Sequence, residues 1–352
     1  MLVKKICLTG GPCAGKTSAL SKVQEDLEEK GYKVFIIDEV ATMYINKGIR
    51  PFGEDSLSWY DFETLVLKTQ VLIEQSYEVA AKNINKPCVI ICDRGIFDIK
   101  SFIDDDMFNR ILKENNLSKL NLMDNYDLVI HMNTAAKGAK EFYTLDNNKA
   151  RSEDVDLAIK RDDACQKAWD FHHNYEIVTN ECTFEEKLQR VVDIINSNLG
   201  IRIRKQRKYL INMTDELDKK LKEDSCTKIS IEQTYLKNDD NNEIRLRKRV
   251  LDSDITYFLS IKKDYKVREE VITYEKIDKE TFEKLLSARK IQNIVTKKRV
   301  CFTANDSIYK VDIFPDKTYV LETDNDAKLP EFIEVVKDVS LDEKFKNKNI
   351  KN

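Results

Sequence analysis

The segment from Leu8 to Ser18, LTGGPCAGKTS, constrains the fold of this chain more than any other. Four of its residues fit the pattern G-x-x-x-x-G-K-[ST] of a phosphate-binding loop: Gly10, Gly15, Lys16 and Thr17. An apolar stretch typical of a strand, Val3 to Leu8, comes before the loop, and a helical pattern follows it. Strand, loop and helix in this order predict an α/β domain with a parallel sheet.

The predicted chemistry of the loop follows from its backbone and two side chains. Backbone N–H groups converge on phosphate oxygens, and the helix N-terminus adds partial positive charge. Lys16 is expected to reach the β- and γ-phosphates, and the Thr17 hydroxyl to bind Mg²⁺. A glycine-rich turn without a ligand is the alternative. We assign the whole loop to nucleotide binding: Gly10, Gly11, Pro12, Cys13, Ala14, Gly15, Lys16, Thr17 and Ser18.

Length, charge and hydropathy narrow the class of protein. A chain of 352 residues favours two domains, and 59 basic against 62 acidic residues give no overall attraction for nucleic acid. No apolar run approaches the roughly 18 residues of a spanning helix, and the chain enters a strand at once instead of a signal peptide. We therefore expect a cytoplasmic protein without a transmembrane segment. The eight cysteines form no C-x-x-C pair, which predicts reduced thiols.

Polar residues follow two further strand patterns. The apolar stretch 32–37 ends at Asp38 and Glu39, and either carboxylate is a candidate catalytic base at the carboxyl edge of a parallel sheet. A helix cap is the alternative for this pair. The stretch 87–92 ends at Asp93 and Arg94, an arrangement of Walker B type in which Asp93 binds Mg²⁺. Arg94 is a candidate phosphate clamp, or it pairs with Asp98 or Asp38.

A charged segment further along is predicted to be a lid. Residues 143–151 have the composition of a loop, and they lead into a charged helix over 153–169. Arg151 and Arg161 are expected to approach the phosphates when this segment closes, or else to form i,i+4 pairs in solvent. The order of elements up to Gly200 is that of a nucleoside- or nucleotide-kinase-like domain, which predicts a first domain over 1–200.

Residues 201–352 show a different pattern. Short alternating strands and turn signals predict an antiparallel barrel or a strongly curved sheet. Arg245 and Arg247 repeat at period 2 and share one face. Candidate anion-binding residues on this and other strands are Lys208, Arg245, Arg247, Lys262, Arg268, Arg299 and Lys310. If these faces line a barrel they form a cationic tunnel for a polyphosphate, with Glu322 and Asp324 as an acidic metal site; an outward-facing basic surface is the alternative.

The second half resembles the CYTH, or triphosphate-tunnel, fold. The matching stretches include Ile244 to Arg249, Ser260 to Lys262, Val267 to Glu270 and Leu321 to Asp324. Catalytic members carry E-x-E-x-K in the opening strand, whereas this chain has Arg204, Gln206 and Lys208 there. The resemblance therefore implies anion binding and argues against metal-dependent triphosphate hydrolysis.

The whole chain resembles the TRPL translocation defect protein 14 family. The resemblance rests on the loop Gly10 to Thr17, on Cys92 to Gly95 with Asp98, and on residues 143–153. It implies binding of GTP or ATP coupled to a phosphate-rich ligand such as a phosphoinositide. It also implies a role in intracellular trafficking, with peripheral contact to intracellular membranes.

Two hypotheses follow from the sequence. The first is a nucleotide-dependent switch whose CYTH-like domain binds an anionic ligand. The second is an enzyme, either a small-molecule kinase of nucleoside type with Glu39 or Asp38 as base, or a tunnel triphosphatase. The missing glutamates favour the switch, whereas the lid and the strand end at Asp93 keep the kinase open. No N-K-x-D signature reads guanine, so the choice between GTP and ATP stays open.

Overall fold

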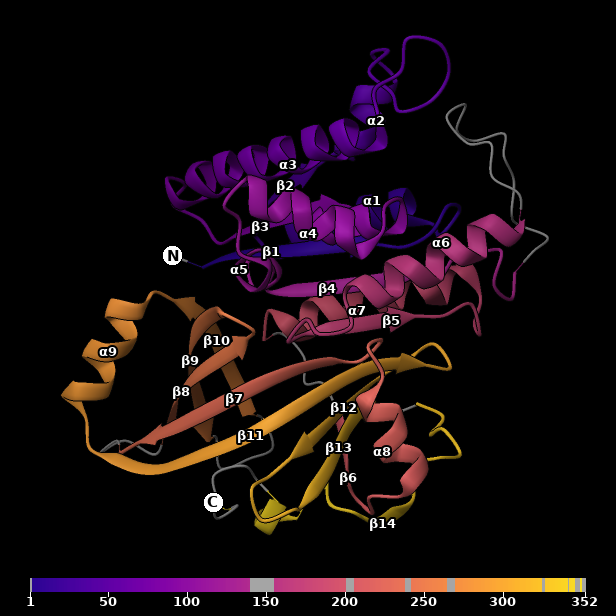
Figure 1. Cartoon of the computed structure of the whole chain (residues 1–352). Helices are drawn as coiled ribbons and strands as arrows, with labels where there is room; N and C mark the ends of the chain where they lie inside the picture. The colour runs from indigo at the N-terminus through magenta and orange to yellow at the C-terminus, as the bar shows by residue number, and fades with distance from the viewer. Residues whose placement is uncertain are drawn as a thin grey trace. The chain divides into compact units, whose positions relative to one another are not determined.

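The computed structural model describes residues 2–139, 155–200, 206–237, 242–264, 270–324, 327–340, 342–345 and 349. The chain divides into two compact units, Met1–Ile195 and Asn196–Asn352, which are shown in Figure 1. We call them unit 1 and unit 2. The predicted lid loop over 143–151, which includes Arg151, lies outside the described residues, as do Arg204 and Arg268. In the described part of the chain, none of the helices combines the length and apolar character needed to cross a membrane.

Unit 1 is built on a five-stranded parallel sheet in the order β2-β3-β1-β4-β5. This confirms the predicted α/β domain with a parallel sheet. Its central strands are buried on both faces, as is typical of parallel sheets covered by helices. The strands are β1 (Val3–Thr9), β2 (Lys33–Ile37), β3 (Cys88–Asp93), β4 (Leu128–Met132) and β5 (Tyr175–Val178).

Helices connect these strands and pack against the sheet (Figure 1). Helix α3 begins at Trp59 because the Ser58 hydroxyl before it accepts the backbone N–H of Asp61 at 3.0 Å. The helices are α1 (Lys16–Glu29), α2 (Val40–Ile45), α3 (Trp59–Lys82), the 3₁₀ helix η1 (Ile96–Ser101), α4 (Asp105–Glu114), α5 (Lys119–Met123), α6 (Val155–Ala168) and α7 (Phe184–Asn198).

Unit 2 is a nine-stranded antiparallel sheet in the order β10-β9-β8-β7-β11-β12-β13-β6-β14. This confirms the predicted antiparallel second domain. The strands are β6 (Gln206–Ile211), β7 (Thr227–Leu236), β8 (Asn242–Leu251), β9 (Asp254–Asp264), β10 (Glu270–Ile277), β11 (Ile291–Ala304), β12 (Ser307–Ile313), β13 (Tyr319–Asp324) and β14 (Val335–Asp338).

Three short helices accompany this sheet: α8 (Asp215–Lys222), α9 (Lys279–Ala288) and the 3₁₀ helix η3 (Glu343–Phe345). Leu217 and Leu221 of α8 join a core cluster with Phe302, Tyr309 and Leu321 from β11, β12 and β13. Phe282 of α9 packs in a second cluster with residues of β7 and β8. Apolar side chains thus anchor α8 and α9 to the sheet.

Candidate functional site

The phosphate-binding loop of unit 1 is shaped by close approach of its backbone to other elements. Gly10 has a φ of 143°, and a Cβ built on it would lie 2.1 Å from the carbonyl oxygen of Met132 in β4. No larger residue fits there without moving β4. Helix α1 follows directly, and its N-cap residue Gly15 makes no side-chain cap. The first N–H groups of α1 are therefore left for a phosphate.

The two residues predicted to contact nucleotide and metal directly lie at the start of α1. Lys16 is buried, and its Nζ lies 3.5 Å from the carbonyl oxygen of Gly10. Thr17 and Ser18 are exposed. The lysine thus lies folded over the loop, while the Thr17 hydroxyl faces solvent.

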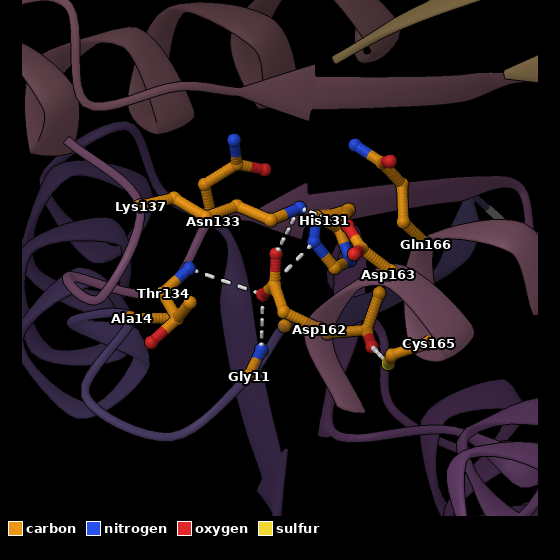
Figure 2. Close-up of polar contacts among 12 residues, drawn as sticks. Gly11, Ala14, His131, Asn133, Thr134, Lys137, Asp162, Asp163, Cys165 and Gln166 are labelled. Carbon is orange, nitrogen blue, oxygen red and sulfur yellow. Dashed lines mark hydrogen bonds and ion pairs between the residues drawn. The ribbon is translucent and has the colours of Figure 1, made fainter. Parts of the chain in front are cut away.

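A buried carboxylate holds the loop from behind (Figure 2). Asp162 of α6 is fully buried, and its Oδ1 accepts the backbone N–H of Gly11 at 2.8 Å and that of Thr134 at 3.0 Å. His131 Nε2 lies 3.2 Å from the same oxygen, and Lys137 Nζ lies 2.9 Å from Oδ2. Burial alone would raise the pKa of Asp162, but His131 and Lys137 outweigh it and hold the pKa well below its usual range.

A buried lysine supports the other side of the loop. Lys187 of α7 donates to the carbonyl oxygens of Ala14 at 3.0 Å and Asn133 at 2.7 Å, and to Asn180 Oδ1 at 2.6 Å. Burial lowers the pKa of Lys187 to about 8. Asp162 lies in α6 and Lys187 in α7, so neither of them follows a strand directly. Together they fix the backbone of the loop through one N–H and one C=O group.

The ends of β2 and β3 bring together a glutamate and an arginine. Glu39 follows β2, Arg94 follows β3, and Arg94 Nε lies 2.9 Å from Glu39 Oε1. Burial alone would raise the pKa of Glu39, but the charges of Arg94 and Lys16 outweigh it and lower the pKa. Glu39 is therefore ionised at neutral pH. Arg94 has a φ of 69°, a conformation that costs free energy in a non-glycine residue and that gathers at functional sites.

Asp98 of η1 fixes the arginine and ties it to the interior. Its Oδ1 accepts hydrogen bonds from Thr9 Oγ1 at 2.6 Å and from Trp169 Nε1 at 2.7 Å, and its Oδ2 lies 3.7 Å from Arg94 Nη1. Arg94 thus pairs with both Glu39 and Asp98. Pairing with Asp98 is one of the alternatives that the sequence left open.

Asp93 has the features of a metal ligand. Its Oδ1 is buried and has no hydrogen-bond partner among the described residues. Burial raises the pKa of Asp93, an effect that the nearby Lys16 opposes. A bound cation would satisfy this oxygen, and with the Thr17 hydroxyl it would supply the hard oxygen ligands that Mg²⁺ prefers. The residues therefore fit a magnesium ion carried in with nucleotide.

A cavity of about 690 Å³ opens beside these groups. Lys16, Glu39, Arg94 and Asp98 line it at the loop, and Arg161 of α6 lines it as well. Further lining comes from α2, from the segment that follows it, from η1 and from one face of α3: Thr42, Ile45, Phe52, Ile99, Phe102, Trp59, Phe62, Glu63, Val66 and Gln70. A cavity of this size accommodates a small organic molecule next to a phosphate-binding loop.

Two polar residues of the cavity were not found from the sequence, Glu63 and Gln70. Glu63 is 2% exposed and lines the cavity, where the charges of Arg94 and Arg161 act on its carboxyl group. Burial raises the pKa of Glu63 to about 8. Gln70 donates its Nε2 to Glu74 Oε1 at 2.8 Å, which leaves its Oε1 as an acceptor. In sequence both residues look like ordinary polar positions of a helix, and only the packing of α3 reveals them.

The other candidates of the first half lie in different surroundings. Asp38 is exposed and does not line the cavity, unlike its neighbour Glu39. Arg161 lies with its guanidinium carbon 4.6 Å from the centre of the Phe102 ring. The structure thus brings Glu39, Arg94 and Arg161 to one cavity. Their catalytic roles, and that of Asp38, stay predictions.

In unit 2 the strand register places basic residues on one face. Arg249 of β8 lies opposite Ile231 of β7, which lies opposite Lys297 of β11, so the three share a face. Arg245 and Arg247 share that face with Arg249. Farther along the same face are Arg299 opposite Asp312, and Lys310 opposite Glu322, which is itself opposite Lys208. Of Lys262 the structure gives only the backbone register, opposite Glu243.

Acidic residues neutralise part of this face. Arg299 donates to Asp312 at 2.7 Å through two nitrogens, and it also donates to Glu322. Lys208 Nζ lies 3.2 Å from Glu322 Oε1. No cluster of three His, Cys, Asp or Glu side chains placed for a metal occurs among the described residues. The assignment of Glu322 and Asp324 to a metal stays a prediction.

Two arginines of β8 donate hydrogen bonds to hydroxyl groups. Arg247 Nη1 donates to the Tyr274 hydroxyl at 3.1 Å, and burial lowers the pKa of Arg247. Arg245 Nη2 donates to Ser260 Oγ at 3.4 Å, whereas its Nε is buried and has no hydrogen-bond partner among the described residues. The Nε of Arg245 is therefore a donor that a ligand could use.

Fold and site together define unit 1 as a P-loop nucleotide-binding domain. A family model described as an AAA domain matches residues 5–187, more than half of the chain. The chain belongs to this AAA domain family. The matched residues include the loop from Gly10 to Thr17, the Glu39–Arg94 pair and the cavity.

No curated protein matches the chain. The structure of the PH1819 protein from Pyrococcus horikoshii OT3 is 16% identical, covers 36% of this chain and 79% of that one, and has a TM-score of 0.28. The structure of the PH1012 protein from the same organism is 17% identical, covers 38% of this chain and 79% of that one, and has a TM-score of 0.27. The structure of a conserved hypothetical protein from Pyrococcus furiosus is 20% identical, covers 36% of this chain and 82% of that one, and has a TM-score of 0.27.

Proposed function

We propose that unit 1 is a small-molecule kinase that transfers the γ-phosphoryl group of ATP or GTP to a hydroxyl group. The observation that carries the proposal is the position of the Glu39 carboxyl group, which pairs with Arg94 at 2.9 Å and lines a cavity of about 690 Å³ together with Lys16 of the phosphate-binding loop. A base beside the phosphates and a cavity for a second molecule are what phosphoryl transfer requires.

Each residue then has a defined task. Lys16 and the loop N–H groups bind the β- and γ-phosphates. Glu39 accepts the proton of the acceptor hydroxyl while the hydroxyl oxygen bonds to the γ-phosphorus. The bond from that phosphorus to the β–γ bridging oxygen breaks at the same time, and the nucleoside diphosphate leaves. Arg94 orients Glu39 and stabilises negative charge on the transferred group. Asp93 and Thr17 would hold Mg²⁺, which when bound neutralises phosphate charge.

A nucleotide-dependent switch is the other reading of the loop. A switch needs nucleotide and metal sites alone, and it gives no reason for a cavity lined by a base, four aromatic side chains and a buried glutamate. The cavity therefore favours transfer to an acceptor. The choice between ATP and GTP is left to experiment.

The test is nucleotide turnover with matched variants. Wild type, Glu39→Gln and the exposed neighbour change Asp38→Asn are compared for Mg²⁺-dependent release of ADP or GDP in the presence of a pool of small metabolites. Loss of stimulated turnover in Glu39→Gln with retained nucleotide affinity supports the kinase. A pool that never stimulates turnover, or equal rates in Glu39→Gln and wild type, would contradict it.

A second candidate function belongs to unit 2. The buried, unpartnered Nε of Arg245, with Arg247 and Arg249 on the same face, favours binding of a multiply charged phosphate compound. A CYTH-like tunnel with a polyphosphate or phosphoinositide ligand is the finer form of this proposal. A role in trafficking, as the resemblance to the TRPL translocation defect protein 14 family implies, stays a prediction.

This second proposal is tested on the full chain. Binding of tripolyphosphate, and of vesicles with and without phosphatidylinositol bisphosphate, is measured for wild type and Arg245→Ala/Arg247→Ala. The control is Lys248→Ala, because Lys248 lies on the other face of β8. Equal binding by wild type and the double variant would rule out this site.

A further inference from the structure

The cavity of unit 1 has an aromatic wall. Phe52, Trp59, Phe62 and Phe102 line it, and the rings of Trp59 and Phe102 are nearly parallel, with an interplanar angle of 13° and centroids 6.1 Å apart. Phe52 and Trp59 are 44% and 37% exposed although both line the cavity. Exposed aromatic side chains at a cavity gain burial when a flat apolar group packs on them.

The Glu39 carboxylate lies at the end of the cavity where the acceptor would react. Acidic and basic residues both line the cavity: Glu39, Glu63 and Asp98, and Lys16, Arg50, Arg94 and Arg161. Arg94 is held by Glu39 and Asp98. At this end a reacting phosphate group would bring a dianion beside the Glu39 carboxylate, whereas a hydroxyl group needs a carboxylate to take its proton.

Glu63 supplies a polar contact inside this aromatic wall. The side chain is 2% exposed and lines the cavity between Phe62 and Val66. A polar group in the lining of an otherwise apolar wall gives a bound molecule a point of orientation. Gln70 lies on the same face of α3, seven residues on, or about 10 Å along the helix. An acceptor that reaches both groups has about that length.

We propose that the acceptor is an uncharged alcohol that carries a flat aromatic or heteroaromatic ring, the build of a nucleoside. The ring packs on Phe62, Trp59 and Phe102, polar atoms of the molecule contact Glu63 and Gln70, and the reacting hydroxyl lies beside Glu39. This inference rests on the proposed kinase function and names the class of its substrate.

The first experiment compares acceptors on the full chain with Mg·ATP and Mg·GTP. The probes are five nucleosides (adenosine, guanosine, cytidine, uridine, thymidine), pyridoxal and riboflavin. Each is matched by its own monophosphate, and ribose and glycerol serve as alcohols without an aromatic ring. We expect at least one ring-bearing alcohol to stimulate turnover at least tenfold more than its monophosphate and the ring-free alcohols.

Two outcomes overturn the inference while leaving the kinase intact. One is a preference for the monophosphates, and the other is equal stimulation by ring-free alcohols. If nucleotide binds and no probe stimulates turnover, the acceptor class is also wrong. Failure of nucleotide to bind at all, measured separately by titration, contradicts the proposed function itself.

The second experiment tests Glu63. With the best acceptor, Glu63→Ala should raise the acceptor KM at least tenfold and leave the nucleotide Kd unchanged. Glu63→Gln should restore most of the loss, because an amide keeps a donor and an acceptor at the same place. The control is Glu54→Gln, an exposed position outside the cavity lining. An unchanged acceptor KM in Glu63→Ala, or no rescue by glutamine, argues against contact with the acceptor.

Discussion

Gly11 donates its backbone N–H to the Oδ1 of Asp162, 2.8 Å away and 151 residues along the chain. The bond joins the phosphate-binding loop to helix α6 in the interior of unit 1. The Asp162 carboxylate accepts the N–H group of Gly11 and thereby fixes the orientation of the peptide group to which that N–H belongs. The loop thus has its shape before nucleotide arrives.

Removal of this carboxylate should weaken both folding and binding. Asp162→Ala leaves two buried N–H groups without their partner and removes one of the two carboxylates that pair with Lys137, so we expect a loss of about 3–5 kcal/mol in the free energy of unfolding. Asp162→Asn keeps an acceptor and should lose less. Urea unfolding and nucleotide titration measure the two effects. Asp163→Ala is the control, since that side chain is 59% exposed and also pairs with Lys137; equal losses in both alanine variants would contradict the prediction.

Lys16→Ala should reduce nucleotide affinity without unfolding the protein. Charged hydrogen bonds to phosphate contribute about 1.5–3 kcal/mol, which corresponds to roughly a tenfold to hundredfold change in Kd. Isothermal titration with Mg·ATP and Mg·GTP gives the affinity, and circular dichroism reports the fold. Lys22→Ala, a change on the same helix away from the loop, should bind as wild type does. An unchanged Kd for Lys16→Ala would refute the P-loop assignment.

Asp93→Asn should act through the metal. The variant keeps the shape of the side chain but loses the charge, so nucleotide affinity should fall mainly when Mg²⁺ is present. Titrations with and without Mg²⁺ separate the two contributions. If the metal dependence of wild type and variant coincides, Asp93 is structural and does not hold the metal.

Glu63 should make the stability of unit 1 fall as pH rises. Burial, assisted by Glu39 and opposed by Arg94 and Arg161, raises the folded-state pKa from 4.5 to about 8. Between these values the folded state keeps a proton that the unfolded state has lost. Stability from this group is therefore present at low pH and declines by about 1.4 kcal/mol per pH unit until the folded pKa is passed.

The measurement is urea unfolding of wild type and Glu63→Gln at pH 6, 7 and 8. The glutamine variant cannot ionise, so its unfolding free energy should decline less steeply than that of wild type over this range. The difference between the two curves isolates the one group, because all other titrating residues are shared. Parallel curves would show that Glu63 is already ionised in the folded protein.

The parts of unit 1 that are predictable from sequence are those set by strand ends. Glu39, Asp93 and Arg94 each follow an apolar run, and parallel strands necessarily bring such residues to one edge. Helix α3 begins at Trp59 because Ser58 caps it. Its first turn brings Trp59 and Phe62 to the cavity wall.

The parts that escape sequence reasoning depend on which face of a helix is buried. Asp162 lies between Arg161 and Asp163 in a charged helix, and nothing in that pattern shows that the middle residue alone is fully buried. Glu63 is likewise one of several polar residues on α3. In unit 2 alternation shows which residues of β8 share a face, whereas the pairing of Arg299 with Asp312 depends on the register of β11 against β12, which alternation leaves open.

Consecutive residues of α6 serve different sites. Arg161 lies against Phe102 in the acceptor cavity, and Asp162 holds Gly11 of the phosphate-binding loop. Consecutive residues of a helix move together. A ligand that shifts the backbone of α6 at Arg161 therefore also shifts Asp162. Nucleotide and acceptor affinities are then thermodynamically linked: whatever factor a bound acceptor applies to the nucleotide Kd, bound nucleotide must apply to the acceptor Kd.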